Sequence, residues 1–148
     1  QGLIDSNAER FKRVHEFEEK INQLQIEVDE DCLKLLATQS PLAQDLRLIL
    51  AMTKINTDLE RMGDQAVNIS LNGVEYLNRP ALKPLIDIPR MAEQARFMTR
   101  EALDAFVKSD VKLAQDVLDR DDAIDQMKDQ IFRELLTGAS FSSMGVLA

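Results

Sequence analysis

The sequence has little of the chemistry that crosslinking or catalysis relies on. Cys32 is the only cysteine and His15 the only histidine among 148 residues, so an internal disulfide is excluded. A lone thiol fits a reducing compartment. Cys32 lies on an apolar stripe and is interpreted as a core residue, and His15 as a surface residue. Because the sequence shows no nucleophile–base constellation and no glycine-rich phosphate loop, it disfavours an enzyme.

Helix breakers and long apolar runs are also scarce. The chain has five glycines, four prolines and no tryptophan, and its long segments rich in Ala, Leu, Glu, Lys, Gln and Met favour helix. No apolar run approaches the ~20 residues that cross a bilayer. The first residues lack a signal-peptide pattern and an initiator methionine. We therefore expect a cytoplasmic chain trimmed from a longer one.

Acidic residues outnumber basic ones, with a net charge of −8. An acidic surface repels phosphate backbones, so nucleic acid is not expected as a partner. Such a surface suits cations or basic partner surfaces.

Capping residues and apolar periodicity predict four helices. The first begins near Ser6 and ends near Gln39. The second has Ser40 as its N-cap and Pro41 at its first position, and runs to about Leu77. The third follows Asp87; residues 109–110 end it and cap the fourth, which runs to about residue 137. Residues 138–148 are predicted to be a loose tail.

Each of the first three helices carries an apolar stripe that should pack in a core. The three stripes comprise Val14, Phe17, Ile21, Leu24, Val28, Cys32 and Leu35, then Ile55, Leu59, Met62, Ala66 and Ile69, then Met91, Ala95, Met98 and Ala102. A faint internal repeat appears when the chain is shifted by about 103 positions, which aligns Ser6 with Ser109 and Ile21 with Ile124.

The second helix carries oxygen-bearing side chains at four-residue intervals, Glu60, Asp64 and Asn68. This spacing places them on one side of the helix, opposite the apolar stripe. Gly63 lies among them, where glycine costs a helix about 1 kcal/mol relative to alanine. Two carboxylates at i and i+4 can hold a hard cation, and glycine can allow a close approach or close helix packing.

Two further helices carry similar sets, spaced four or seven residues apart. The first helix carries Glu18, Asn22 and Asp29, and the fourth carries Asp121 and Asp125. Acids spaced in this way are most often a solvated helix surface, because their repulsion costs only about 0.2–0.5 kcal/mol per pair. Spacing alone therefore leaves a cation site and a plain surface both open.

The segment "QSPLAQDLRLILAMTKINTDLERMGDQAVNIS", residues 39–70, closely resembles the signature of the PhoU family of phosphate-transport accessory proteins. The segments "EEKINQLQIEVDEDCLKLLA" and "SDVKLAQDVLDRDDAIDQMKDQIFRELL" resemble helices of the same family. The resemblance covers roughly residues 1–137, and "LERMGDQAVNI" is its most specific part.

The resemblance implies an all-α antiparallel bundle of two tandem three-helix repeats. Residues 1–77 would be the first repeat without most of its N-terminal helix, 78–88 a linker, and 89–148 a second repeat without its final helix. It implies a negative regulator of phosphate uptake and of phosphate-starvation signalling. Partners would be the phosphate transporter's ATPase subunit and a sensor histidine kinase, with the protein peripheral to the membrane at most.

The resemblance also implies a bound metal, divalent or ferric (Mg, Mn, Fe or Zn). The family's acidic motifs fall on seven positions, Glu60, Asp64 and Asn68, Glu18 and Asn22 on the facing helix, and Asp121 and Asp125 in the second repeat. A metal-free helical adaptor remains an alternative. A di-iron carboxylate enzyme is a weaker one, because His15 has no Glu three residues before it. Helices missing from both repeats would leave apolar stripes open, so we expect a homodimer.

Overall fold

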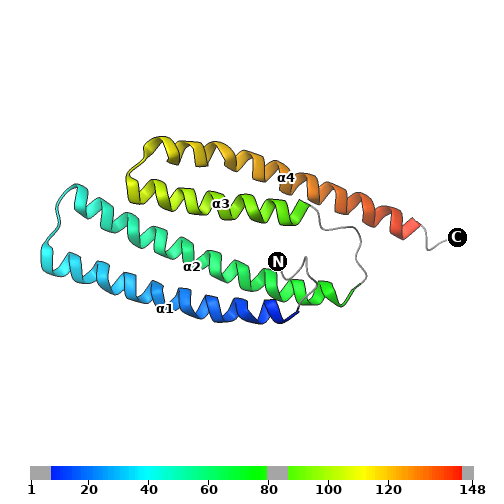
Figure 1. Ribbon diagram of the computed structural model, residues 1–148, viewed down its shortest axis with the longest axis horizontal. Helices are drawn as coiled ribbons and strands as arrows, with labels where there is room; N and C mark the ends of the chain where they lie inside the picture. Colours follow the sequence, from blue (N-terminus) through cyan, green and yellow to red (C-terminus); the bar gives the residue numbers. More distant parts are fainter. Residues whose placement is uncertain (1–7, 80–86, 145–148) are drawn as a thin grey trace. The chain divides into compact units, whose positions relative to one another are not determined.

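The computed structural model describes residues 8–79 and 87–144, in which four helices follow one another (Figure 1). They are α1 (Ala8–Gln39), α2 (Gln44–Leu77), α3 (Asp87–Lys108) and α4 (Val111–Met144). No strand occurs in this described part, and the predicted all-α class is confirmed. The predicted helix start at Ser6 and most of the predicted linker lie outside the described residues.

The chain divides into two compact units, residues 1–80 and residues 81–148. In the first unit α1 packs against α2, and in the second α3 packs against α4 (Figure 1). Both pairs are antiparallel, since their helices are joined by short turns.

The predicted start of the second helix is wrong. Its N-cap is Ala43, which has φ 46° and makes no side-chain capping hydrogen bond, and Ser40 also has a positive φ of 45°. The amide of Asp45 donates to the carbonyl of Leu42 at 3.1 Å. Reversing the chain between two antiparallel helices requires non-helical residues, so Pro41 lies in the turn instead of opening the helix.

The predicted cap of the fourth helix is confirmed, whereas its predicted end is wrong. Asp110 Oδ1 accepts a hydrogen bond from the Leu113 amide at 3.0 Å, as an N-cap residue does. The helix continues to Met144, through most of the predicted loose tail. Extending an existing helix costs far less than starting one, and the single Gly138 is too small a penalty to end it. Residues 145–148 lie outside the described part.

The line of α2 that packs against α1 consists of residues seven apart. Ile49, Gly63 and Ser70 are buried and Asn56 is half-buried. On α1, Phe11 and Cys32 are buried. Small side chains at positions 63 and 70 allow the two helices to approach closely.

The predicted packing stripe of the second helix is therefore only partly covered, with Ile55 and Leu59 half-buried. Met62 is 48% exposed and Ile69 59% exposed. These residues directly precede Gly63 and Ser70, so they lie about 100° to one side of the packing line. Apolar periodicity identifies an apolar side of a helix, but it does not identify the neighbour that covers that side.

The first unit has two contrasting faces beside its helix interface. Phe17 and Leu24 of α1 directly precede the half-buried Glu18 and Gln25, just as Met62 and Ile69 precede the packing line of α2. In an antiparallel pair, equal offsets place residues on the same side. We call this side the apolar face; it comprises Phe17, Leu24, Val28, Leu35, Met62 and Ile69, all at least 37% exposed.

The opposite side, which we call the acidic face, is formed by residues that follow the interface positions. It carries Glu19 and Asn22 on α1, and Glu60, Asp64 and Leu71 on α2. The predicted acidic lines of the two helices thus lie on one surface of the first unit.

A polar contact joins the helices of the second unit. Arg120 of α4 pairs with Glu101 of α3, and its guanidinium lies 5.4 Å from the centre of the Phe97 ring. Ala105 of α3 and Ile131 of α4 are also buried in this unit. Because both charged groups are partly shielded from water, this pair is worth more than a fully exposed ion pair.

Candidate functional site

Gly63 is located where α1 and α2 approach each other closely. A Cβ atom at position 63 would lie 3.3 Å from Ile21 Cδ1 and 3.6 Å from Ile21 Cγ2. Such spacing is tight for carbon atoms, so glycine gives Ile21 the room it occupies. Of the two roles considered for this glycine, the structure supports close helix packing.

Asn56 fixes how the two helices are aligned lengthwise. Its Nδ2 donates to the carbonyl oxygen of Gln25 at 2.8 Å and to Asp29 Oδ1 at 2.9 Å. Together with the contact between Ile21 and Gly63, these bonds set an antiparallel register in which paired residue numbers add up to about 81–85. In that register Asn22 is opposite Glu60.

The same register places Glu18 level with Asp64 along the helix axes, so four of the predicted metal ligands fall into two pairs by their position along the helices. Asn22 Nδ2 donates to Glu18 Oε1, whereas Asn22 Oδ1 is buried and has no hydrogen-bond partner. Glu60 is half-buried and Asp64 exposed. An acceptor left without a partner costs about 1–3 kcal/mol, so accepting a hydrogen bond or coordinating a cation would lower the free energy of this oxygen.

The carboxylates on α2 are not neutralised by the protein itself. Across residues 9–79 neither Glu60 nor Asp64 makes an ion pair or hydrogen bond through its side chain. Asn68 is exposed, and because it lies about one turn after Asp64, it is rotated further away from α1. It therefore does not join the two pairs at the interface.

These residues fit a hard cation only if amide or water oxygens complete its shell. Among the described residues, no group of three or more His, Cys, Asp and Glu side chains could hold a metal. A cation on the acidic face would take carboxylate oxygens from Glu60 and Asp64 and the unpartnered oxygen of Asn22. Oxygen ligands of this mixed kind suit Mg²⁺ or Mn²⁺. The seven-residue ligand set stays a prediction.

The predicted pair of the fourth helix is surrounded differently. Asp121 and Asp125 are both exposed, and Lys128 Nζ lies 2.8 Å from Asp125 Oδ1. That hydrogen bond is the main reason why the pKa of Lys128 is raised above its ordinary value. A metal at Asp125 would have to displace this ammonium, so the second set fits a cation less well than the first.

Cys32 has the environment of a structural thiol. It is 3% exposed, and burial, followed by the nearby charges of Asp29 and Asp31, raises the pKa of its thiol. A raised pKa keeps the sulfur protonated and unreactive near neutral pH. The interpretation of Cys32 as a core residue agrees with this environment.

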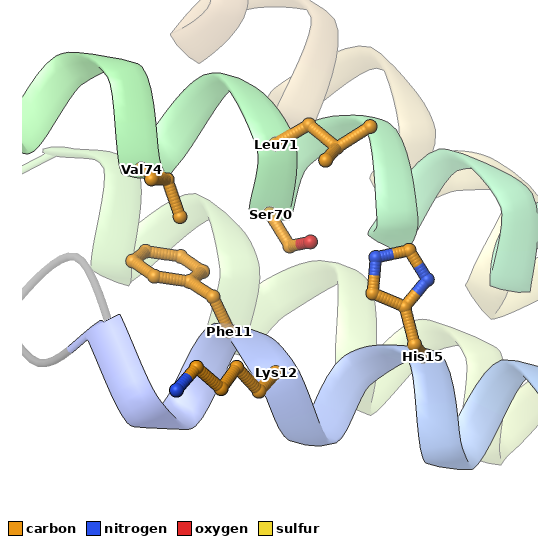
Figure 2. Close-up of a pocket in the computed structure, with 6 residues that line it drawn as sticks. All are labelled: Phe11, Lys12, His15, Ser70, Leu71 and Val74. Carbon is orange, nitrogen blue, oxygen red and sulfur yellow. The ribbon is translucent and has the colours of Figure 1, made fainter.

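An open apolar pocket was not expected from the sequence. It has a volume of about 240 Å³ and lies between the start of α1 and the last turns of α2 (Figure 2). Figure 2 shows Phe11 and Val74 at one end and His15 and Leu71 at the other, with Ser70 between them. Lys12 completes the lining. The pocket forms where the small Ser70 of α2 lies near the large Phe11 of α1, a pairing that the sequence of neither helix reveals.

The fold and the site define a helical protein built from antiparallel helix pairs, with uncompensated carboxylates and a shallow pocket on one face. The PhoU domain model matches residues 1–72 and 88–145. The chain belongs to the PhoU family.

Similar proteins include two named phosphate-specific transport system accessory protein PhoU homolog. The one from Aquifex aeolicus is 34% identical, with 93% of this chain and 62% of the relative covered. The one from Pseudomonas putida is 36% identical, with 91% of this chain and 53% of the relative covered. This chain thus spans little more than half the length of these relatives.

A solved structure resembles the chain over almost its whole length. The crystal structure of PhoU from Pseudomonas aeruginosa matches with a TM-score of 0.90 and 32% identity, covering 98% of this chain and 70% of that one. Within the described residues, no helix is long and apolar enough to cross a membrane.

Proposed function

We propose that this protein is a negative regulator of phosphate uptake and of phosphate-starvation signalling. In this role it couples a phosphate ABC transporter, through its ATPase subunit, to a sensor histidine kinase. It works in the cytoplasm by binding partners and catalyses no reaction itself. The observation that carries the proposal is the family match over residues 1–72 and 88–145, together with relatives named as phosphate-transport accessory proteins.

The surfaces of the first unit support a binding role. The apolar face exposes several large side chains, and the acidic face carries carboxylates without partners. A protein that works through contacts needs exposed surfaces of this kind.

Deleting the full-length gene tests the regulatory proposal. We expect a starvation-response reporter, silent in phosphate-rich medium, to become active in the deletion strain, and phosphate uptake to rise. Re-expression of the full-length gene should restore silence. A reporter that stays silent in the deletion strain contradicts the proposal.

We further propose that the acidic face of the first unit binds a divalent or ferric cation through Glu60 and Asp64, with Asn22 and Glu18 beside them. A cation would neutralise two adjacent carboxylates and satisfy the buried Asn22 oxygen. Bound there, the metal would supply positive charge and bridge α1 to α2. These residues would hold it through oxygen atoms.

Removing both carboxylates of α2 tests this site. In Glu60→Ala/Asp64→Ala we expect calorimetric binding of Mg²⁺, Mn²⁺, Zn²⁺ and Fe³⁺ to disappear, while helix content stays unchanged. Stability without metal should rise by about 0.2–0.5 kcal/mol, since a like-charge pair is removed. The control Asp58→Ala/Glu75→Ala changes the charge of α2 equally at two exposed positions that pair with arginines. If both double variants bind metal equally well, the proposed site at Glu60 and Asp64 is rejected.

A metal-free adaptor is the alternative, favoured by the lack of a three-residue cluster of His, Cys, Asp and Glu among the described residues. In that case a chelator would leave binding to the transporter ATPase subunit unchanged. If binding to that subunit instead weakens on chelation and recovers when Mg²⁺ or Mn²⁺ is restored, the hypothesis of a metal-free adaptor is excluded.

A further inference from the structure

The pocket between α1 and α2 opens on the acidic face of the first unit. Leu71 directly follows the interface residue Ser70, as Asp64 follows Gly63, so both side chains lie on the same side of α2. His15 lies seven residues before Asn22 on the matching side of α1. The pocket and the uncompensated carboxylates are therefore parts of one continuous surface.

The lining of the pocket is suited to an apolar group. The six residues around it expose almost only carbon, and the cavity of about 240 Å³ is open to solvent. Lys12, which borders it, is paired with Glu9 at 2.7 Å, so its positive charge is partly offset. An open hollow of this kind holds a single large side chain of a partner better than it encloses a free molecule.

The carboxylates near the pocket determine which charges a partner would need beside the side chain that fills it. Asp64 is seven residues from Leu71 and Glu60 eleven, which corresponds to about 10 and 16 Å along the helix. Glu19 adds a third carboxylate on the α1 side. A partner helix lying along this face would therefore meet negative charge two and three turns from its anchor.

We propose that the acidic face is a docking site for a basic amphipathic helix of a partner protein. In the metal-free protein, one large apolar side chain of that helix fills the pocket, and Lys or Arg residues about seven and eleven positions away pair with Asp64 and Glu60, which a bound cation would otherwise occupy. The inference rests on the partner-binding part of the proposed function and adds the location and chemistry of the contact. The match between apolar anchor, cations and the spacing on this face provides specificity.

The test uses the full chain and a synthetic probe in chelator-treated buffer. The probe is a 20-residue alanine-based helical peptide with one Phe and with Lys seven and eleven positions after it. A second peptide has the same sequence reversed, so that a partner helix running in either direction along the face is tested. Binding is measured by fluorescence anisotropy at low salt. We expect at least one of the two to bind, and binding to weaken at high salt as the charges are screened.

Variants of both partners locate the contact. Leu71→Ser in the protein and Phe→Ala in the peptide should each weaken binding about tenfold, as loss of a buried anchor does, and should not add when combined. Leu118→Ser is the control, since this α4 residue is even more exposed than Leu71. Replacing both peptide lysines by Glu should abolish binding.

The proposal is overturned if neither peptide binds, if Leu71→Ser and Leu118→Ser behave alike, or if Phe→Ala leaves the affinity unchanged, which would indicate charge attraction alone. Unchanged circular dichroism verifies that the variants are folded. The reporter experiment above does not depend on this peptide, so failure here is distinguishable from failure of the regulatory proposal.

Discussion

At the scale of single residues, two positions of α2 determine how it packs against α1. Gly63 has no side chain at the point where Ile21 crosses from α1, and Asn56 donates two hydrogen bonds from α2 to α1. The glycine sets how near the helices come, and the asparagine sets their lengthwise register. Both settings determine which carboxylates of the two helices become neighbours.

Substitutions at Gly63 should reveal this tight contact. Gly63→Ala gains about 1 kcal/mol of helix propensity, and the displacement of Ile21 Cδ1 offsets part of that gain. We expect a net change in the free energy of unfolding below about 1 kcal/mol. Gly63→Leu should lower stability by about 1–3 kcal/mol, because the helices must move apart.

The background Ile21→Val is the control, since it removes the Cδ1 atom that an alanine would meet. There, Gly63→Ala should stabilise by nearly the full helix-propensity gain. Urea denaturation of the parent chain and the four variants measures these values. If Gly63→Leu is as stable as the parent chain, the close approach has no energetic role.

At the scale of elements, the ends of the helices follow from their capping residues in some places and from chain reversal in others. Asp110 caps α4 through its side chain. The turn before α2 has positive φ at Ser40 and Ala43 and no side-chain cap at all. A sequence rule for caps therefore works for one turn and not for the other.

Removing the cap of α4 should weaken the second unit. We expect Asp110→Ala to reduce stability by about 0.5–2 kcal/mol, since the Leu113 amide loses its acceptor. Asp122→Ala is the matched control, an exposed aspartate inside the same helix, where alanine should be neutral or slightly stabilising. Thermal unfolding followed by circular dichroism compares them, and equal midpoints would show that the hydrogen bond contributes nothing.

Much of the fold could be predicted from local signals. The ends of α1 and α2, the start of α3 and the cap of α4 agree with expectation, because caps and periodicity act within a few residues. The side of α2 that meets α1 was not predictable in this way. It is lined by Asn56, Gly63 and Ser70, which are polar or small, and periodicity searches for large apolar residues.

The candidate site was predicted only in part, for a related reason. Spacing along one helix placed Glu60 beside Asp64, and the family resemblance placed Glu18 and Asn22 on the facing helix. The register that brings them together depends on Asn56 and Gly63, which act between helices. The pocket at Leu71 likewise requires two helices and has no signature within either one.

At the scale of the whole molecule, large apolar side chains remain uncovered. Phe17, Leu24 and Ile69 are each more than half exposed. Fully burying a side chain of this size contributes about 1.5–3 kcal/mol. Several of them together are comparable to the ~5–15 kcal/mol net stability of a typical domain.

We therefore predict that the chain forms a homodimer in which these surfaces become buried. Light scattering coupled to size exclusion at micromolar concentration should give twice the monomer mass, and the thermal midpoint should rise with concentration. Met62→Ser/Ile69→Ser should shift the mass toward monomer, whereas Leu118→Ser/Val107→Ser in the second unit should do so less. One monomeric mass at every concentration would contradict the prediction.

The seven-residue spacing of Ile49, Asn56, Gly63 and Ser70 has a consequence for the shape of the first helix pair. A straight α-helix has 3.6 residues per turn, so a line of every seventh residue drifts by about 20° per heptad. Helices that keep such a line in contact must wind gently around each other with a left-handed supercoil. Inserting one residue into α2 would rotate everything beyond it by about 100°. Such an insertion between Asn56 and Gly63 would bring Met62 to the interface in place of the glycine, and the two helices would no longer fit together along their length.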